Sequence, residues 1–309
     1  MAGQNSKSSV DYRRSIDLLR FVACFGIVWD HARAPYADVG YLALAIFLVL
    51  TSFLAVGSFE RSKGAKFWLS RAQRIAVPWL FWCVVFRIVY EWFQRAPGVA
   101  PLLTEPGSLL IGPYIHLWFL PFVMIFLVVI PTISTQIQTR QELIVACVLL
   151  GLISVPFALL HAEAGLAAWF VAEEKIPQPL PQWFFSLPLF LYGGISATAH
   201  RMGHSGIPVI AAAIISLVLT VLLPEFASVQ MILAALVFEM VWRIRIDGRW
   251  PTTLASFAFG IYLMHPIFML VAFKLFGPDV DRSLGALVAF FGSWAATAVL
   301  QRTPLARIV

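Results

Sequence analysis

Apolar residues fall in long blocks along this chain, and polar residues gather in the short stretches between the blocks. The blocks are roughly 16 to 23 residues long. An α-helix rises about 1.5 Å per residue, so most of the blocks can cross the roughly 30 Å hydrocarbon core of a bilayer. The pattern predicts an all-α, polytopic membrane bundle with about ten transmembrane helices. The predicted segments are 15–34, 40–58, 76–94, 114–133, 142–160, 182–199, 207–223, 227–242, 253–275 and 284–301.

The composition favours a membrane protein over a soluble enzyme. Hydrophobic residues make up 60% of the 309 residues and charged residues only 12%, which is far from the average soluble domain. The connections are short, so we expect one integral membrane domain over residues 1–309, with a polar tail over 1–14 and no soluble second domain. Cys24, Cys83 and Cys147 lie inside apolar segments, where buried thiols are expected rather than disulfides.

The net charge of +6 reflects membrane topology rather than nucleic-acid binding. With a cytoplasmic N-terminus, 15 lysines and arginines lie on inner connections and four on outer ones, as the positive-inside rule requires. We therefore expect a protein of a bacterial-type inner membrane with both termini in the cytoplasm. Two long outer connections are expected at about 95–113 and 161–181. The inner set is Lys7, Arg13, Arg14, Arg61, Lys63, Lys66, Arg71, Arg74, Arg140, Arg201, Arg243, Arg245, Arg249, Arg302 and Arg307; the outer set is Arg33, Arg95, Lys175 and Arg282.

The first apolar segment carries two ionisable residues at a helical spacing. Arg20 and His31 are 11 positions apart, close to three turns, so their side chains point the same way about 16 Å apart along the axis. Ionisable groups in a membrane helix are costly and usually face a protein interior or a wet cavity. The spacing predicts a cation near one membrane face and an imidazole near the other. Simple anchoring at the two interfaces is the alternative.

Two acidic neighbours accompany this pair. Asp17 lies three positions before Arg20, within reach for an ion pair. Asp30 precedes His31 directly and is therefore about 100° around the helix from it, so we do not expect the two to share one face.

A cationic pair also lies in the inner connection that leads into the third segment. Arg71 and Arg74 are three apart and predict a two-pronged patch on one helix face. Guanidinium groups bind phosphate oxygens through paired hydrogen bonds, so the patch suits a phosphorylated ligand. An ordinary anchor for lipid head groups is the alternative, and composition alone favours it.

Further ionisable residues lie within the apolar segments. His116 opens the fourth segment, and His265 lies mid-segment beside Pro266, whose missing N–H leaves a carbonyl free inside the membrane. Structural hydrogen bonds between helices are as good an interpretation of both histidines as chemistry. The sequence does not identify the partners of Glu239 and Lys274. The remaining histidines, His161, His200 and His204, are expected to be solvated surface groups, and no cluster has the spacing of a metal site.

Taken together, these segments resemble a known family. The Arg-x10-His arrangement within SIDLLRFVACFGIVWDH is similar to the first-helix signature of the membrane-bound acyltransferase-3 family. The chain departs from the family pattern where Thr51-Ser52-Phe53 replaces the frequent Ser-Gly-Phe, which puts a larger residue where helices are expected to approach closely. The other matching segments, in the family's order, are AIFLVLTSFL (45–54), SRAQRIAVPW (70–79), HLWFL (116–120) and SFAFGIYLMHP (256–266).

The resemblance implies a stand-alone O-acetyltransferase that moves an acyl group, commonly acetyl, from cytoplasmic acyl-CoA to a hydroxyl of an exported or lipid-linked polysaccharide. His31 would act as a general base or as an acyl relay, and no metal is implied. A carrier that exports the same precursor without chemistry and a non-catalytic membrane scaffold are the alternatives; a homo-oligomer is possible for each. The expected site residues are His31 and Arg20 for catalysis, Arg20, Arg71 and Arg74 for the donor phosphates, and His116, Trp118, Tyr262 and His265 for the acceptor.

Overall fold

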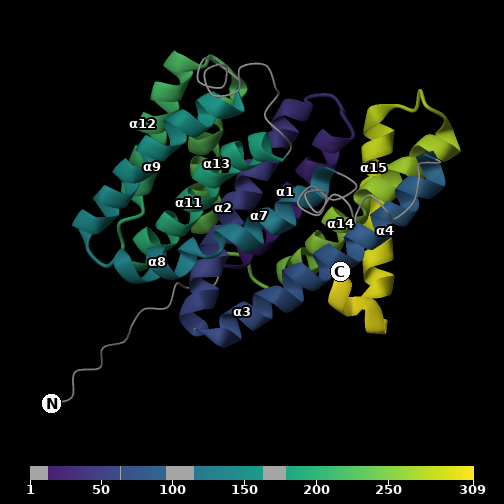
Figure 1. Cartoon of the computed structure of the whole chain (residues 1–309), viewed down its shortest axis with the longest axis horizontal. Coiled ribbons are helices and arrows are strands. Elements are labelled where there is room, and N and C mark those ends of the chain that lie inside the picture. The colour runs from purple at the N-terminus through teal and green to yellow at the C-terminus, as the bar shows by residue number, and fades with distance from the viewer. Residues whose placement is uncertain (1–12, 63, 95–114, 163–178) are drawn as a thin grey trace, which may run out of the picture.

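A computed structural model describes residues 13–62, 64–94, 115–162 and 179–309, and every regular element within these ranges is helical (Figure 1). The all-α prediction is therefore confirmed. The elements lie in the regions of the ten apolar segments. Two shorter helices precede the third segment, the fourth segment is broken into shorter helices, and one short helix follows the tenth. The elements are α1 (Arg14–His31), α2 (Ala37–Arg61), α3 (Ala65–Arg71), η1 (Ala72–Ala76), α4 (Val77–Gln94), η2 (Ile115–Trp118), α7 (Phe119–Phe126), α8 (Val129–Gln136), α9 (Arg140–His161), α11 (Leu180–Arg201), α12 (Gly206–Leu222), α13 (Phe226–Arg243), α14 (Trp250–Phe276), α15 (Arg282–Leu300) and η3 (Pro304–Ile308).

Six of the helices in the described ranges are long and apolar enough to cross a membrane, and the bent pair of helices over 116–136 makes seven if it counts as one span. The helix α1 falls short of this criterion because Arg14, Asp17, Arg20 and Asp30 interrupt its 18 residues. The helix α12 has only 17 residues. The protein is thus an integral membrane protein by its apolar helices, while ten crossings and cytoplasmic termini stay predictions. The two long outer connections lie mostly outside the described residues.

The helix α2 occupies the centre of the bundle (Figure 1). It packs against α1, α8, α11 and α13, and two thirds of its most apolar 18-residue stretch is buried. The helices α14 and α15 pack on each other and on α1, on the opposite side from α9 and α12. The helix α1 therefore lies between α2 and α14, which decides where its polar residues face.

Small residues let the central helices approach closely. A Cβ atom added to Gly193 of α11 would lie 2.2 Å from the carbonyl oxygen of Val49, so the two backbones are in direct contact. The neighbouring Gly194 leaves room for the hydroxyl of Ser52, which would lie 3.0 Å from an added Cβ. The larger residue noted in the Thr51-Ser52-Phe53 sequence is thus accommodated by a glycine on the facing helix. Such small-residue contacts are typical of membrane helix packing.

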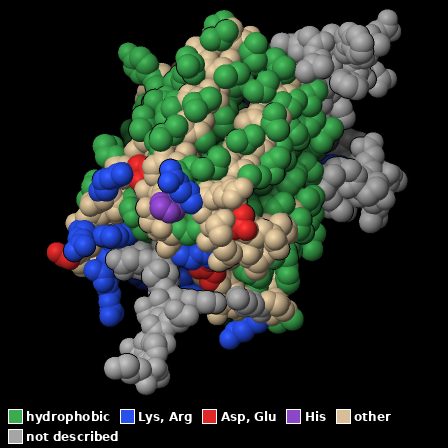
Figure 2. Space-filling view, turned by 90° about the vertical axis from the view of Figure 1, so that its left-hand side faces the viewer, with side chains coloured by type: hydrophobic (Ala, Val, Ile, Leu, Met, Phe, Trp, Pro, Cys, Tyr) green, Lys and Arg blue, Asp and Glu red, His purple; other side chains and the backbone are tan. Residues whose placement is uncertain are grey.

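The outer helices present apolar side chains outward. Figure 2 shows the side of the bundle that carries α9 and α12, with hydrophobic side chains over its upper part and lysine and arginine gathered at its lower end. This division is what a lipid-facing surface with one polar rim requires. The exposed apolar residues on the two helices are Ile144, Val145, Val148, Leu149, Leu152, Ile210, Ile214, Leu217, Val218, Val221 and Leu222.

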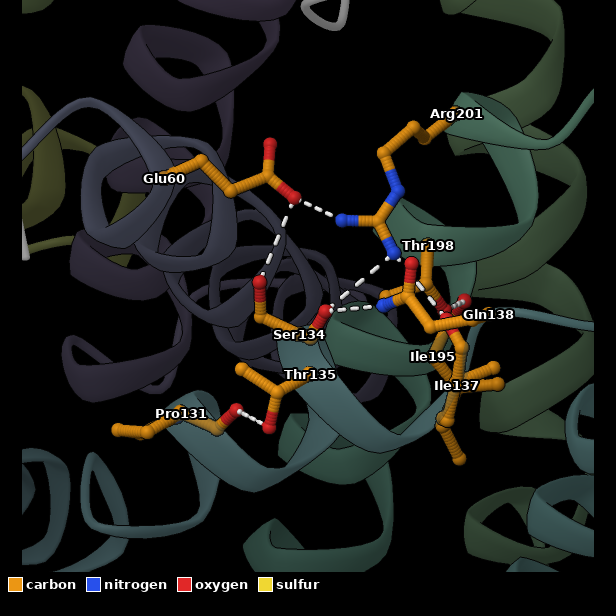
Figure 3. Close-up of polar contacts among 9 residues, drawn as sticks. All are labelled: Glu60, Pro131, Ser134, Thr135, Ile137, Gln138, Ile195, Thr198 and Arg201. Atoms are coloured by element: carbon orange, nitrogen blue, oxygen red, sulfur yellow. Dashed lines mark hydrogen bonds and ion pairs between the residues drawn. The ribbon is translucent and has the colours of Figure 1, made fainter. Parts of the chain in front are cut away.

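A polar cluster joins α2, α8 and α11 at this lower end (Figure 3). The Arg201 guanidinium pairs with the Glu60 carboxylate and also donates to the carbonyl of Ile137 at 3.1 Å, just beyond α8. The Ser134 hydroxyl donates to the same carboxylate at 3.3 Å. A cation at the C-terminal end of a helix satisfies carbonyls that lack an intrahelical partner. We interpret the cluster as structural.

A candidate active site between α1, α2 and α14

A cavity of about 450 Å³ opens at the C-terminal end of α1. Its walls come from α1 with the following turn and α2, from η2 and from α14, so three parts of the chain that are distant in sequence meet there. Three of the lining residues are histidines, and two are carboxylates. The lining residues are Asp30, His31, Arg33, Asp38, Tyr41, His116, His265, Pro266, Met269, Leu270 and Phe273.

Pro266 determines the hydrogen bonding of the histidine that precedes it. An α-helical carbonyl normally accepts the N–H four residues later, and for Tyr262 that residue is Pro266, which has no N–H. The Tyr262 carbonyl instead lies 2.7 Å from Nδ1 of His265. Because a carbonyl can only accept, His265 carries its proton on Nδ1. The free carbonyl inferred from the sequence is thus used by the neighbouring histidine.

His265 in turn contacts His31. Its Nε2 atom lies 2.8 Å from Nδ1 of His31, and the two rings stack at a centroid distance of 5.0 Å. In a neutral His265 with its proton on Nδ1, Nε2 is an acceptor, so His31 must donate from Nδ1. A neutral His31 then has its lone pair on Nε2. Since His31 is exposed where it lines the cavity, this arrangement gives the cavity a basic nitrogen.

His116 completes the inner wall, and Tyr262 lies buried behind it. The His116 ring packs edge-on against His265 at 5.3 Å and is itself 4% exposed. The Tyr262 hydroxyl donates to the backbone carbonyl of His116, which ties η2 to α14. Of the four residues expected to contact the acceptor, the structure therefore brings His116 and His265 to the cavity wall. Tyr262 and Trp118 are buried beside it, Trp118 against Phe119 and Phe122.

The turn between α1 and α2 has an unusual backbone. Arg33 and Tyr36 both have positive φ, at 54° and 62°, although neither is glycine. Such left-handed residues are uncommon and cost about 1 kcal/mol or more each. The Trp29 indole donates to the Pro35 carbonyl at 2.8 Å and helps to hold this turn. The turn places Asp38 and Tyr41 on the cavity wall, two residues that the sequence analysis missed.

Asp30 also lines the cavity, although its helical angle places it on a different face of α1 from His31. The cavity extends around the end of α1, between α2 on one side and α14 on the other. Asp38 lies in the first helical turn after a proline-containing loop, and it was the sign in the sequence that this end is polar.

Arg20 and His31 face the same helix, as their spacing predicts. Arg20 donates to the carbonyl of Ala255 at 3.2 Å, and the bond from His31 reaches His265 farther along α14. Arg20 also pairs with Asp17 at 3.8 Å, so the predicted ion pair is confirmed. Between them, the fully buried Cys24 thiol bonds to the Ala258 carbonyl at 3.2 Å. The interface of α1 and α14 is therefore closed between the two residues.

Arg71 and Arg74 lie at a break in their helix. Arg71 ends α3 and Arg74 belongs to η1, a five-residue π-helix, and π segments of this kind often occur at functional sites. The Arg71 guanidinium donates to Ser58 of α2 and lies over the Phe67 ring at 5.2 Å, whereas Arg74 is exposed. The buried Nε atoms of Arg20 and Arg71 have no hydrogen-bond partner in the part of the chain that the structure describes.

Another histidine forms a buried pair with a carboxylate elsewhere in the bundle. His200 was expected to be solvated, but its side chain is 8% exposed and its Nε2 lies 2.6 Å from the Glu239 carboxylate. Arg243 completes the group at 3.1 Å from the other carboxylate oxygen. The expectation was wrong because the partner of His200 comes from another helix, 39 residues later. Glu239 thereby acquires the partners that the sequence did not identify.

Comparison with known proteins agrees with the helical pattern. A family model described as an acyltransferase domain, that of the acyltransferase-3 family, matches residues 13–302, which is nearly the whole chain. No curated protein and no solved structure matches the chain. No group of three or more potential ligands in the described ranges could hold a metal ion. The matched region includes every residue of the cavity as well as Arg20, Arg71 and Arg74, and the chain belongs to the membrane acyltransferase-3 family.

Proposed function

We propose that this acyltransferase moves an acetyl group from cytoplasmic acetyl-CoA to a sugar hydroxyl of an exported or lipid-linked polysaccharide. The observation that carries the proposal is the bond between His31 and His265, because it gives a neutral His31 a basic Nε2 atom in the cavity. Asp30, Asp38 and Tyr41 offer hydrogen-bonding groups on the same wall, which suits an acceptor rich in hydroxyls.

The chemical step uses that nitrogen as a general base. Nε2 of His31 takes the proton of the acceptor hydroxyl as its oxygen attacks the thioester carbonyl carbon. A C–O bond forms and the C–S bond breaks, and the leaving thiolate of CoA takes the proton from the imidazolium. His265 stays neutral and holds the His31 ring in place. In a relay, Nε2 would attack the thioester itself, and rapid quenching of the reaction with labelled donor would then trap an acyl group on His31.

The donor phosphates are assigned to Arg20, Arg71 and Arg74. The helices α1 and α2 are joined by a short turn and pack together, so Arg20 and the Ser58–Arg71 contact both lie away from the His31 end. Their unpartnered buried Nε–H groups are what a phosphate would satisfy. This requires α1 and α14 to separate at Cys24 when the donor arm passes, since the Cys24 thiol bonds to the Ala258 carbonyl there.

The proposal is tested by incubating the purified protein with labelled acetyl-CoA and measuring CoA release with and without a polysaccharide acceptor. We expect acceptor-dependent release together with label on the glycan. An exporter without acyl chemistry would instead move the glycan in the absence of any acyl-CoA and release no CoA. A scaffold would do neither and would tolerate the loss of both Arg20 and His31.

A further inference from the structure

The cavity at His31 borders a second hollow. This hollow has a volume of about 590 Å³ and shares Leu270 and Phe273 of α14 with the first cavity. Its other lining residues are Lys274, Gly277, Pro278 and Arg282. The two hollows therefore lie next to each other along α14, one at the histidines and the other at the turn between α14 and α15.

The second hollow is cationic. Lys274 and Arg282 are its only ionisable lining residues in the described part of the chain, so the described lining contributes two cations and no carboxylate. Arg282 lies over the Phe273 ring at 5.3 Å, which fixes the guanidinium above the shared wall. Two aspartates belong to the same turn, but neither lines the hollow, and Asp281 accepts the Leu284 amide at 3.0 Å.

The position of these cations is unusual for a membrane protein. The outer connections are expected to be poor in lysine and arginine, and the described ranges contain only two of the four outer cations, Arg33 and Arg282. Arg33 lines the first cavity and Arg282 lines the second hollow. The positive-inside rule disfavours lysine and arginine in outer connections, so the presence of Arg33 and Arg282 here points to an anionic ligand.

The hollow also adjoins the lipid-facing surface. Leu275 and Phe276, which directly follow Lys274, are 70% and 54% exposed. A ligand that places a charged group between Lys274 and Arg282 can therefore extend an apolar chain along these residues into the bilayer. A cationic hollow at the edge of an apolar surface suits an amphiphile with an anionic head group.

We propose that Lys274 and Arg282 form a subsite for the phosphate of a lipid-linked acceptor, with the saccharide directed toward His31. This inference rests on the proposed acyl transfer for its biological meaning. His265 and Lys274 are nine residues apart on one helix, about 14 Å along its axis and half a turn around it. The acylated hydroxyl therefore belongs to a sugar close to the lipid phosphate rather than to the distal end of a long polymer.

Binding of labelled dodecyl phosphate to the protein, purified in an uncharged detergent, tests this subsite. We expect unlabelled dodecyl phosphate to compete at least tenfold better than either dodecanol or inorganic phosphate. We expect the double variant Lys274→Gln/Arg282→Gln to weaken binding at least tenfold, and Lys274→Arg/Arg282→Lys, which keeps both charges, to retain it. Arg302→Gln, an exposed cation beyond the opposite end of α15, is the matched control.

Three results would overturn the subsite. Equal competition by inorganic phosphate would make it a site for a free anion, and equal competition by dodecanol would reduce it to an apolar surface. Unchanged binding in the double glutamine variant would remove Lys274 and Arg282 from the site. The wild-type competition series needs no variant, so it decides the question even if a variant does not fold. No acyl donor is used, so failure of the acyl transfer would appear separately, as a lack of CoA release.

Discussion

Nδ1 of His31 and Nε2 of His265 lie 2.8 Å apart, although the two residues are separated by 234 positions in the sequence. The direction of this hydrogen bond follows from Pro266, which frees the Tyr262 carbonyl for His265. A proline on α14 therefore decides which nitrogen of His31, on α1, is left to act as a base. The carbonyl, His265 and His31 form a chain in which each group orients the next.

Replacing Pro266 by alanine separates activity from stability. The new N–H would bond to the Tyr262 carbonyl and compete with His265 for it, so the orientation of His31 would be lost. We expect kcat to fall at least tenfold while the temperature of unfolding is unchanged or higher, because a proline inside a helix is itself unfavourable. Pro156→Ala in α9 is the control, since it also removes a helical proline but lies away from the cavity. Unchanged kcat in Pro266→Ala would contradict this chain of hydrogen bonds.

In the proposed mechanism, His265 positions His31 and does not contact the reacting atoms. We expect His265→Ala to lower kcat at least tenfold and to leave the KM for acetyl-CoA nearly unchanged, because the donor phosphates bind elsewhere. The pH profile of kcat should also shift, since His31 would no longer donate to a fixed acceptor. His204→Gln, an exposed histidine, should change neither quantity. A rise of at least tenfold in the KM for acetyl-CoA, without loss of kcat, would assign His265 to donor binding instead.

The donor assignment can be tested with the donor itself. If Arg71 binds the 3′-phosphate of CoA, wild-type protein should prefer acetyl-CoA to its dephospho form, and Arg71→Gln should lose that preference. We expect the KM for acetyl-CoA to rise about tenfold in the variant, toward the value for the dephospho donor, with kcat retained. If the variant still distinguishes the two donors as the wild type does, Arg71 does not contact that phosphate.

Close contact between α2 and α11 limits what Gly193 can become. An alanine there would place its Cβ against the Val49 carbonyl oxygen and push the helices apart, so we expect a loss of about 1–3 kcal/mol in the free energy of unfolding. Gly285→Ala in α15 is the matched control because nothing lies within 4 Å of its added Cβ. It should be neutral or gain up to about 1 kcal/mol. Thermal unfolding in detergent measures both; equal effects would show that the contact is not limiting.

Most of the helices could be predicted from the sequence because a bilayer demands long apolar runs, and these are visible residue by residue. The helical start at Ala65 and the bend between α7 and α8 could not be predicted in this way. The shared direction of Arg20 and His31, and the free carbonyl beside Pro266, followed from helical geometry alone. The pairing of His31 with His265 could not be predicted, because it depends on which helices become neighbours. The prediction that His200 is solvated was wrong for the same reason, since its partner Glu239 comes from another helix. Asp38 and Tyr41 were missed because only the turn at Arg33 and Tyr36 brings them to the cavity.

The central claim is that the Nε2 lone pair of His31 carries acyl transfer. The most direct test is the rate of acetyl transfer from acetyl-CoA to a glycan acceptor by His31→Gln, compared with wild type at equal amounts of inserted, folded protein. Loss of a general base typically costs about 10²–10⁴-fold, so we expect a fall of at least 100-fold. Transfer at the wild-type rate in His31→Gln would contradict the account.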